Sequence, residues 1–90
     1  MKVKIFLWSN FFRELKDYIK AIESLASKKG IALTKIPLKT YKKKMKSGYT
    51  KKTHRFILVL TNPRKEFFFS LRKIWYNKRH IGVYVECLKK

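Results

Sequence analysis

The chain has 90 residues, of which 24 are Lys or Arg and 5 are Asp or Glu, so its formal charge is +19 at neutral pH. This length supports a single domain over residues 1–90 and excludes a multi-domain enzyme. A hydrophobic fraction of 46% is too high for a disordered basic tail, so the chain is expected to fold around a core. Because a compact body with this charge repels itself, we expect a polyanion, most naturally nucleic acid, to neutralise it.

The sequence lacks the patterns that are typical of a metal site, a membrane span or a catalytic centre. Its one cysteine, Cys87, and its two histidines, His54 and His80, stand at no metal-ligand spacing. The longest apolar runs, 5–8 and 56–60, are far shorter than the roughly 20 residues that span a bilayer. The five acids are dispersed, with no pair placed as an acid–base dyad. We therefore expect no enzyme, cofactor, metal, small-molecule substrate or membrane partner.

The first predicted element is a strand over residues 2–8, where side chains alternate with a period of two. The face expected to be buried is formed by Val3, Ile5 and Leu7. Phe6 and Trp8 belong to the opposite face. Because this alternation starts at the first residues of the chain, no removable signal is expected there.

An amphipathic helix follows and is predicted to end at Gly30. Its apolar stripe, spaced by three and four residues, consists of Phe12, Leu15, Ile19, Ile22 and Ala26. Ser9 or Asn10 is expected to cap the first turn by accepting backbone N–H groups. Acids lie early in this helix and lysines at its end, as the helix dipole prefers, so these charges are interpreted as structural.

The middle of the chain is predicted to form two strands joined by a long basic loop. Residues 31–38 are apolar and extended, and Pro37 is expected to loosen the pairing at their end. Residues 39–53 contain seven lysines and no acid, which predicts an extended loop outside the core. The apolar segment 54–60, with its β-branched and aromatic residues, predicts a central strand buried on both faces.

The last third is predicted to add a helix and a strand. Pro63 suits the first position of a helix that runs to about residue 77. Its alternative apolar stripes are Phe67, Leu71 and Ile74, or Phe68, Leu71 and Trp75. Residues 81–88 alternate and predict a final strand, in which Cys87 is interpreted as a small core residue.

The predicted order is therefore strand, helix, strand, strand, helix, strand. This order is typical of the α+β class, and more narrowly of the ferredoxin-like or split βαβ fold. Right-handed crossovers would place both helices on one face of a four-stranded sheet. The long basic loop would then join the second and third strands, and the other sheet face would be open to a partner.

Several segments, spaced along nearly the whole chain, carry a resemblance to a known family. They are 2–7, the Lys-Lys-Gly at 28–30, the Ile-Pro-Leu-Lys-Thr at 36–40, the Lys-Lys-Thr-His-Arg-Phe at 51–56 and the Gly-Val-Tyr-Val-Glu at 82–86. Taken in this order, they resemble small-subunit ribosomal protein ten, the family that includes the antitermination factor NusE. The sequence departs from the family at the loop tip, where Ser-Gly-Tyr-Thr at 47–50 replaces Ser-Pro-His-Val, so different tip contacts are expected.

The resemblance implies a structural protein of the head of the small ribosomal subunit, which binds rRNA and neighbouring head proteins during translation. A NusE-like role in transcription antitermination uses the same fold and remains an alternative. A more distant alternative is a basic amphipathic protein of membrane surfaces. The mixed charges of the first helix disfavour the membrane role, because the basic charge peaks in the loop and not beside an apolar helix face.

Basic side chains in and near the loop are the expected RNA contacts. Lysine supplies charge without reading sequence, so we expect contacts to phosphates and to RNA shape. Mutual repulsion of the lysines would hold the loop open, so its folding is expected to be coupled to binding. The predicted RNA-binding residues are Lys39, Lys42, Lys43, Lys44, Lys46, Lys51, Lys52, His54, Arg55, Arg64, Lys78 and Arg79.

Aromatic and loop-tip residues are assigned to a protein interface. The predicted interface residues are Phe6, Trp8, Tyr41, Ser47, Gly48 and Tyr49. Phe6 and Trp8 also suit stacking on RNA bases, but the Arg/Lys-Gly-Phe/Tyr signature of such RNA recognition domains is absent from the third strand, which favours protein contact. Stacking on unpaired bases remains an alternative for Tyr41, Tyr49, His54 and Arg55.

The composition also suggests a compartment. Phe, Tyr, Met, Ile, Asn and Lys, which have AT-rich codons, fill 44 positions, whereas Gly, Ala, Arg and Pro fill 13. This bias predicts a gene of an AT-rich organelle genome and hence a mitochondrial ribosome. A plastid or the cytoplasm of an AT-rich bacterium is the alternative.

Overall fold

The computed structural model describes residues 1–76 and 80–88. It is a mixed α+β structure with two helices and an antiparallel sheet of five strands. The elements in chain order are β1 (Lys2–Ser9), α1 (Phe12–Lys28), β2 (Ala32–Pro37), β3 (Tyr41–Lys44), β4 (Thr50–Thr61), α2 (Lys65–Tyr76) and β5 (Gly82–Leu88).

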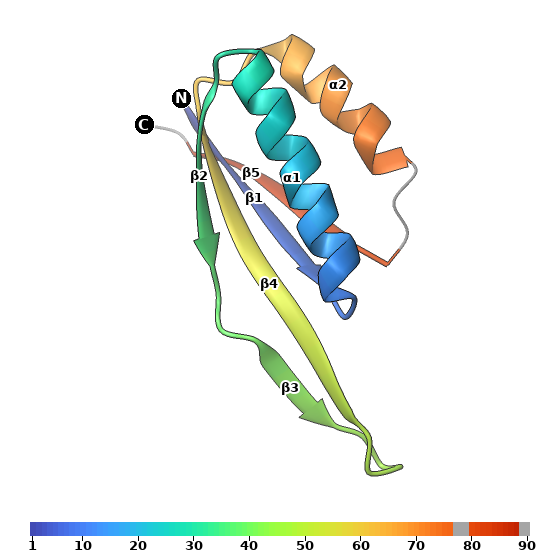
Figure 1. Cartoon of the computed structure of the whole chain (residues 1–90). Coiled ribbons are helices and arrows are strands. Elements are labelled where there is room, and N and C mark those ends of the chain that lie inside the picture. The colour runs from blue at the N-terminus through green and yellow to red at the C-terminus, as the bar shows by residue number, and fades with distance from the viewer. Residues whose placement is uncertain (77–79, 89–90) are drawn as a thin grey trace.

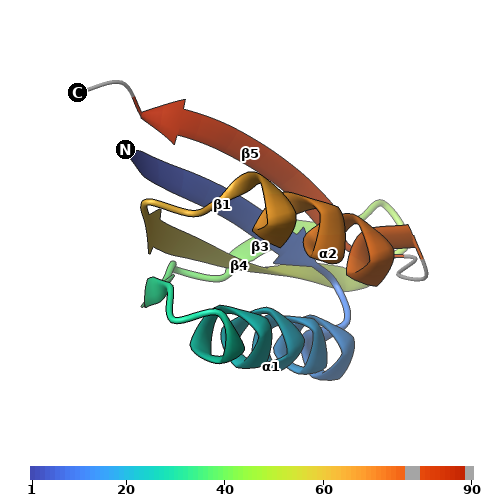
Figure 2. The ribbon, with the colours of Figure 1, turned by 90° about the horizontal axis from the view of Figure 1, so that it is seen from above.

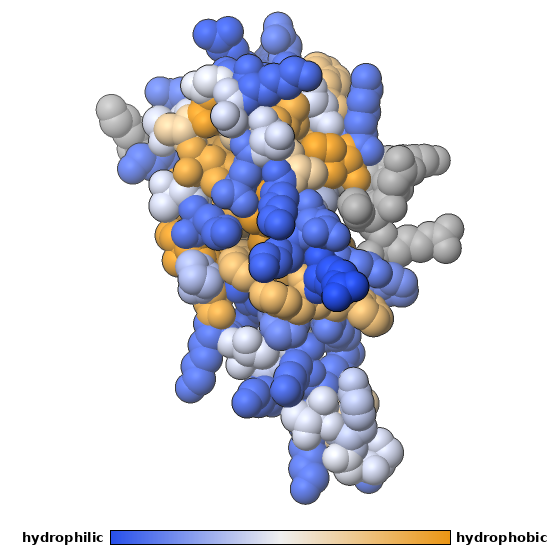
Figure 3. Space-filling view, viewed as in Figure 1, coloured by the Kyte–Doolittle hydropathy of each residue, from blue (hydrophilic) through white to orange (hydrophobic). Residues whose placement is uncertain are grey.

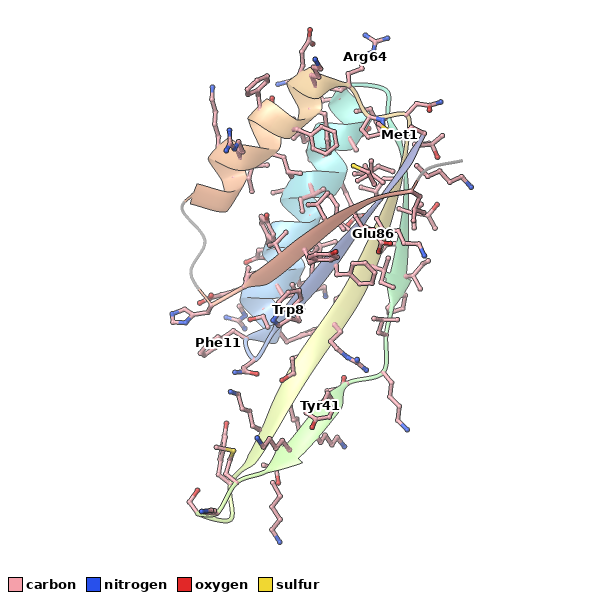
Figure 4. All side chains as sticks on the ribbon, turned by 180° about the vertical axis from the view of Figure 1, so that it is seen from behind. Met1, Trp8, Phe11, Tyr41, Arg64 and Glu86 are labelled. Atoms are coloured by element: carbon pink, nitrogen blue, oxygen red, sulfur yellow. The ribbon has the colours of Figure 1, made fainter. Side chains whose placement is uncertain are left out.

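Four of the strands lie side by side in the order β2-β4-β1-β5, so β1 and β4 are central and β5 is an edge. Ile5 of β1 stands opposite Leu58 of β4 and Val85 of β5, which sets the register of the sheet. Both helices lie on the same side of the sheet, in front of it in Figure 1 and behind it in the reverse view of Figure 4. Figure 2, seen from above, shows α1 on one side of the strands, with α2 drawn across them in this view.

The core lies between this helix layer and the sheet. As predicted, alternate residues of β1 are buried, and so are four of the five residues in the predicted stripe of α1. The fifth, Phe12, is 45% exposed, while Tyr18 is fully buried. The buried apolar residues are Val3, Ile5, Leu7, Leu15, Tyr18, Ile19, Ile22, Ala26, Leu58, Leu60, Phe67 and Leu71.

Helix α1 begins later than predicted and without a side-chain cap. Its N-cap residue is Phe11, which makes no side-chain capping hydrogen bond. Ser9 is instead the last, buried residue of β1, where its Oγ accepts from Phe11 N–H at 3.0 Å and donates to the His80 carbonyl at 2.7 Å. The hydroxyl thus joins the β1–α1 turn to the segment before β5. At the other end Gly30 takes a positive φ of 67°, which only glycine adopts without strain.

The largest correction concerns residues 39–53, which the sequence predicts as one open loop. Tyr41–Lys44 forms β3, which pairs with the first four residues of β4, so the sheet has five strands where four were predicted. Figure 1 shows this hairpin projecting away from both helices. The projection gives a radius of gyration of 14.2 Å, above the about 12 Å expected for a compact chain of this length. The pairing satisfies backbone N–H and C=O groups that an open loop would leave to water.

Three smaller predictions are also corrected, two of them because one part of the sheet is left uncovered. Leu58 and Leu60 are fully buried, but Ile57 and Val59 on the other face of β4 are only half-buried, so this strand is not enclosed on both sides. Cys87 is exposed rather than a core residue, because it lies near the end of edge strand β5. Helix α2 begins two residues after Pro63, at Lys65.

Candidate nucleic-acid interface

The candidate site is the projecting hairpin, residues 41–53, which we call the basic arm. It comprises β3, a turn and the first four residues of β4, and every residue from 41 to 52 is exposed. Met45 N–H donates to the Tyr49 carbonyl at 2.7 Å, and Gly48 N–H donates to the Met45 carbonyl at 3.0 Å. Gly48 has a φ of 89°, a conformation that favours glycine in such a turn. Ser47, Gly48 and Tyr49, predicted as interface residues, therefore form the tip.

The pairing of the arm sets like charges opposite each other. Lys42 stands opposite Lys52, and Lys43 stands opposite Lys51. Directly opposite residues of an antiparallel pair lie on the same face, and successive pairs alternate faces. Each face of the arm therefore carries a lysine pair, and both faces are basic. On the side shown in Figure 3, blue hydrophilic side chains project from the arm, its tip is paler, and the strongest hydrophobic colour lies on the globular part.

The positive charge of the arm has no internal counterpart. Of the five acids, three lie on α1, one on α2 and one on β5. Like charges directly opposite in a sheet destabilise the pairing. The arm is thus held by its backbone ladder and its turn, and a chain of phosphates along either face would remove the repulsion.

The root of the arm is fixed by Arg55. Its Nη2 and Nε donate to the Lys39 carbonyl at 2.7 Å and 3.2 Å, across the connection between β2 and β3. Thr53 Oγ1 donates to Asn10 Oδ1 at 3.0 Å, which links the arm to the start of α1. Arg55 remains exposed, but its guanidinium already holds a backbone carbonyl, so the structure gives it a positioning role at this root.

On the helix side of the root, His54 is partly buried and its ring lies 4.9 Å from that of Phe12, centroid to centroid. A hollow of about 390 Å³ on the open side and another of about 480 Å³ on this side flank the root. The hollow on this side is lined by Asn10, Phe11, Tyr49, Thr50, Lys51, Lys52 and His54. Asn10, Phe11 and Thr50 were not predicted as site residues. They come together only because β4 pairs with β1 up to Ser9 and its first residues extend beyond that end of β1.

The predicted basic residues do not form one site. Arg64 is exposed at the end of the molecule opposite the arm, as its label beside Met1 in Figure 4 shows. Lys78 and Arg79 lie outside the described residues. The structure thus brings together Lys42, Lys43, Lys44, Lys46, Lys51 and Lys52 on the arm, with Lys39, His54 and Arg55 at its root.

The face of the sheet opposite the helices gathers the predicted aromatic residues. Phe6 and Trp8 point to this face, and Trp8 is 41% exposed. Tyr84 of β5 stands opposite Phe6, with ring centroids 5.9 Å apart, and is 57% exposed. The sequence analysis missed Tyr84, although its place in the alternation of the last strand assigns it to this face.

No helix in the described part of the chain is long and apolar enough to cross a membrane. Within residues 1–76 and 80–88, no group of three or more His, Cys, Asp or Glu side chains is placed to hold a metal ion. No protein-family model matches the chain, and no curated protein matches it.

Proposed function

We propose that this chain is a structural, rRNA-binding protein of the small ribosomal subunit, of the ribosomal protein ten and NusE family. The observation that carries the proposal is the basic arm, a projecting hairpin with lysine pairs on both faces and no acid. Double-stranded and folded RNA present closely spaced phosphates that such an arm neutralises, with release of counterions. An arm that extends from the body reaches phosphates that a compact domain does not.

The fold supports the same proposal. We interpret the strand order β2-β4-β1-β5, with two helices on one side, as a ferredoxin-like sheet that the arm extends. The segments that resemble the ribosomal family fall on β1, on the end of α1, on the two strands that lead into and out of the arm, and on β5. The arm tip is the surface proposed to meet neighbouring proteins of the subunit head.

In the proposed function, the arm is a projecting, positively charged element that contacts the RNA backbone. Its lysines bind phosphates and not base edges, so the RNA is recognised by shape. Because the hairpin register is already formed, binding orders side chains more than backbone, which lowers its entropic cost. We place the protein in an organellar, mitochondrial small subunit, on the compositional bias described above.

The test is a charge reversal of the arm. The variant K42E/K43E/K44E is expected to lose incorporation into small subunits, because it replaces three phosphate contacts by repulsion. The matched control is K20E/K65E/K73E, which makes the same change of charge at three exposed helix positions away from the arm. Incorporation is measured by sedimentation of tagged protein with small subunits, and folding by circular dichroism.

Normal incorporation of the arm variant would overturn the assignment of the arm. Equal loss in both variants would show that net charge, and not the arm, drives association. Identification of RNA and protein in the gradient peak separates the other roles. A slow peak with a helical protein and nascent transcript would indicate antitermination, and an RNA-free pool on membranes would indicate a lipid partner.

A further inference from the structure

Side chains on the open face of the sheet form a partly exposed aromatic row beside the root of the arm. Trp8 lies on central strand β1, between Arg55 of β4 and Gly82 of β5. Figure 4 looks onto this face and shows the label of Trp8 over the strands and that of Tyr41 on the arm beyond them. Tyr41 is 55% exposed. These residues come from four strands and meet only through the sheet.

The indole of Trp8 lies directly over Gly82. A side chain at position 82 would overlap the Trp8 ring atoms, including Cε2 and Nε1. The absence of a Cβ at this position therefore lets the ring lie down on the backbone of β5, toward the edge of the sheet. One side of the indole is covered by this strand, while the side chain as a whole is 41% exposed. An aromatic ring backed by a strand and open on its other side is the geometry of a stacking surface.

Because the indole leans toward β5, space remains between the indole and the residues of β4 and the arm. A hollow of about 390 Å³ lies there, between the end of β1 and the start of the arm. Aromatic and aliphatic side chains form most of its lining, with Thr53 and Arg55 as polar members. The apolar lining residues that belong to the open face are Phe6, Trp8 and Tyr41, and Leu38 joins them from the connection between β2 and β3.

The charge around this face favours a polyanion over an acidic or neutral surface. Lys2 and Lys4 lie on the same face of β1, and Lys43 and Lys51 continue the face along the arm. Glu86 of β5 stands opposite Lys4, at the end of the face away from the arm. Phosphates that follow the lysines of the arm would bring the next nucleotides of the same strand over Trp8.

We propose that the open sheet face between Trp8 and Tyr41 binds unpaired bases of single-stranded RNA, with one base stacked on the exposed side of the Trp8 indole. This inference rests on the proposed RNA-binding function and adds to it a second contact of different chemistry. Stacking on aromatic rings tolerates any base, because every base has a π-face. The arm binds phosphates, and the sheet face selects RNA that has unpaired nucleotides.

The experiment measures binding of two probes, a 12-nucleotide oligouridine and a 12-base-pair RNA duplex. All proteins carry Trp75→Phe, so that Trp8 is the remaining tryptophan and reports stacking by quenching of its fluorescence. We expect oligouridine to quench Trp8 and the duplex to leave it nearly unchanged. In this background Trp8→Leu is expected to lower the affinity for oligouridine by about tenfold and that for the duplex by less than about twofold.

Two further variants separate stacking from loss of structure. Gly82→Ala keeps Trp8 but displaces its ring, so it is expected to weaken oligouridine binding as Trp8→Leu does. Phe69→Leu is the matched control, because it removes an aromatic ring that is 64% exposed on α2, away from this face, and it should change neither affinity. The salt dependence of binding should be the same in Trp8→Leu and in its parent, since stacking releases no counterions.

The outcomes distinguish this inference from the proposed function. Failure of oligouridine to quench Trp8, or an equal loss of both affinities in Trp8→Leu, would overturn the stacking site while arm-dependent duplex binding still stood. Loss of a neighbouring ribosomal protein from Trp8→Leu subunits, with oligouridine affinity unchanged, would also overturn it and assign the face to protein docking. If the arm variant K42E/K43E/K44E binds both probes as the unaltered chain does, the proposed function itself fails.

Discussion

The two ends of strand β4 show two ways in which one sequence element is held in place. At the end within the globular body, Leu58 and Leu60 are fully buried and stand opposite Ile5 and Val3 of β1. At the arm end, Lys51 is exposed and stands opposite another lysine. Strand β4 is paired at both ends, with β1 and β2 in the body and with β3 in the arm.

The difference shows that hydrogen bonding alone does not decide where this strand is stable. Burial of apolar side chains stabilises the body by about 25 cal/mol for each Å² removed from water. The arm has no such burial, and its lysine pairs oppose its formation. The body is therefore the part that folds by its own core, and the arm is the part that the proposed RNA partner would stabilise.

The largest expected effect comes from a core substitution at the body end of β4. Leu58→Ala should lower the free energy of unfolding by about 2–5 kcal/mol, because it leaves a cavity among fully buried neighbours. Substitution to alanine at the arm end, Lys52→Ala, removes a like-charge contact. This variant should lower the free energy of unfolding by less than about 0.5 kcal/mol, or should raise it. Urea denaturation measures both. A loss at Lys52 as large as that at Leu58 would contradict the division of the strand.

An intermediate effect is expected from pH at the core of the body. Burial raises the pKa of the Tyr18 hydroxyl above its ordinary value of 10.0, and this hydroxyl is buried without a hydrogen bond from any described residue. Above pH 10 the unfolded chain loses this proton while the folded one keeps it, so stability falls with rising pH, by at most about 1.4 kcal/mol per pH unit.

The control for this pH effect is Tyr18→Phe, which has no proton to lose. Thermal unfolding of both proteins from pH 9 to 11 isolates the contribution of Tyr18 from every other pH effect that the two proteins share. The difference in stability between the two proteins should be constant up to about pH 10 and should change above it. Parallel curves over the whole range would show that Tyr18 ionises alike in the folded and unfolded chains.

The smallest expected effect sharpens the electrostatic description of the arm. Lys51→Glu turns a like-charge pair with Lys43 into an opposite-charge pair, and should stabilise the arm by about 0.5 kcal/mol at low salt. Lys46→Glu makes the same change of charge in the turn, where no lysine stands opposite in the β3–β4 ladder. It should therefore stabilise the arm less than Lys51→Glu does. Hydrogen exchange of the arm amides at low and high salt compares the two. Equal protection in both variants would show that the effect comes from net charge.

Much of the fold and part of the site follow from local patterns in the sequence. Alternation places Val3, Ile5 and Leu7 on the buried face of β1, and the absence of acids at 39–53 locates the basic surface. The pattern does not show that this segment pairs with itself, because seven like charges argue against a strand. It also does not place Tyr84 beside Phe6, since that contact depends on the register of two strands about 80 residues apart in the chain.

The sequence by itself determined the charge of the molecule, the faces of its strands and helices, and the position of its basic segment, because these depend on composition and on spacing between near neighbours. The tertiary structure decided what pairing over long distances controls. This pairing places lysines opposite each other in the arm and places Trp8 over Gly82. It also brings the hydroxyl of Ser9 within hydrogen-bond distance of the segment before β5. It also left Cys87 exposed on the edge strand, since alternation assigns a residue to a face but does not say whether that face is covered.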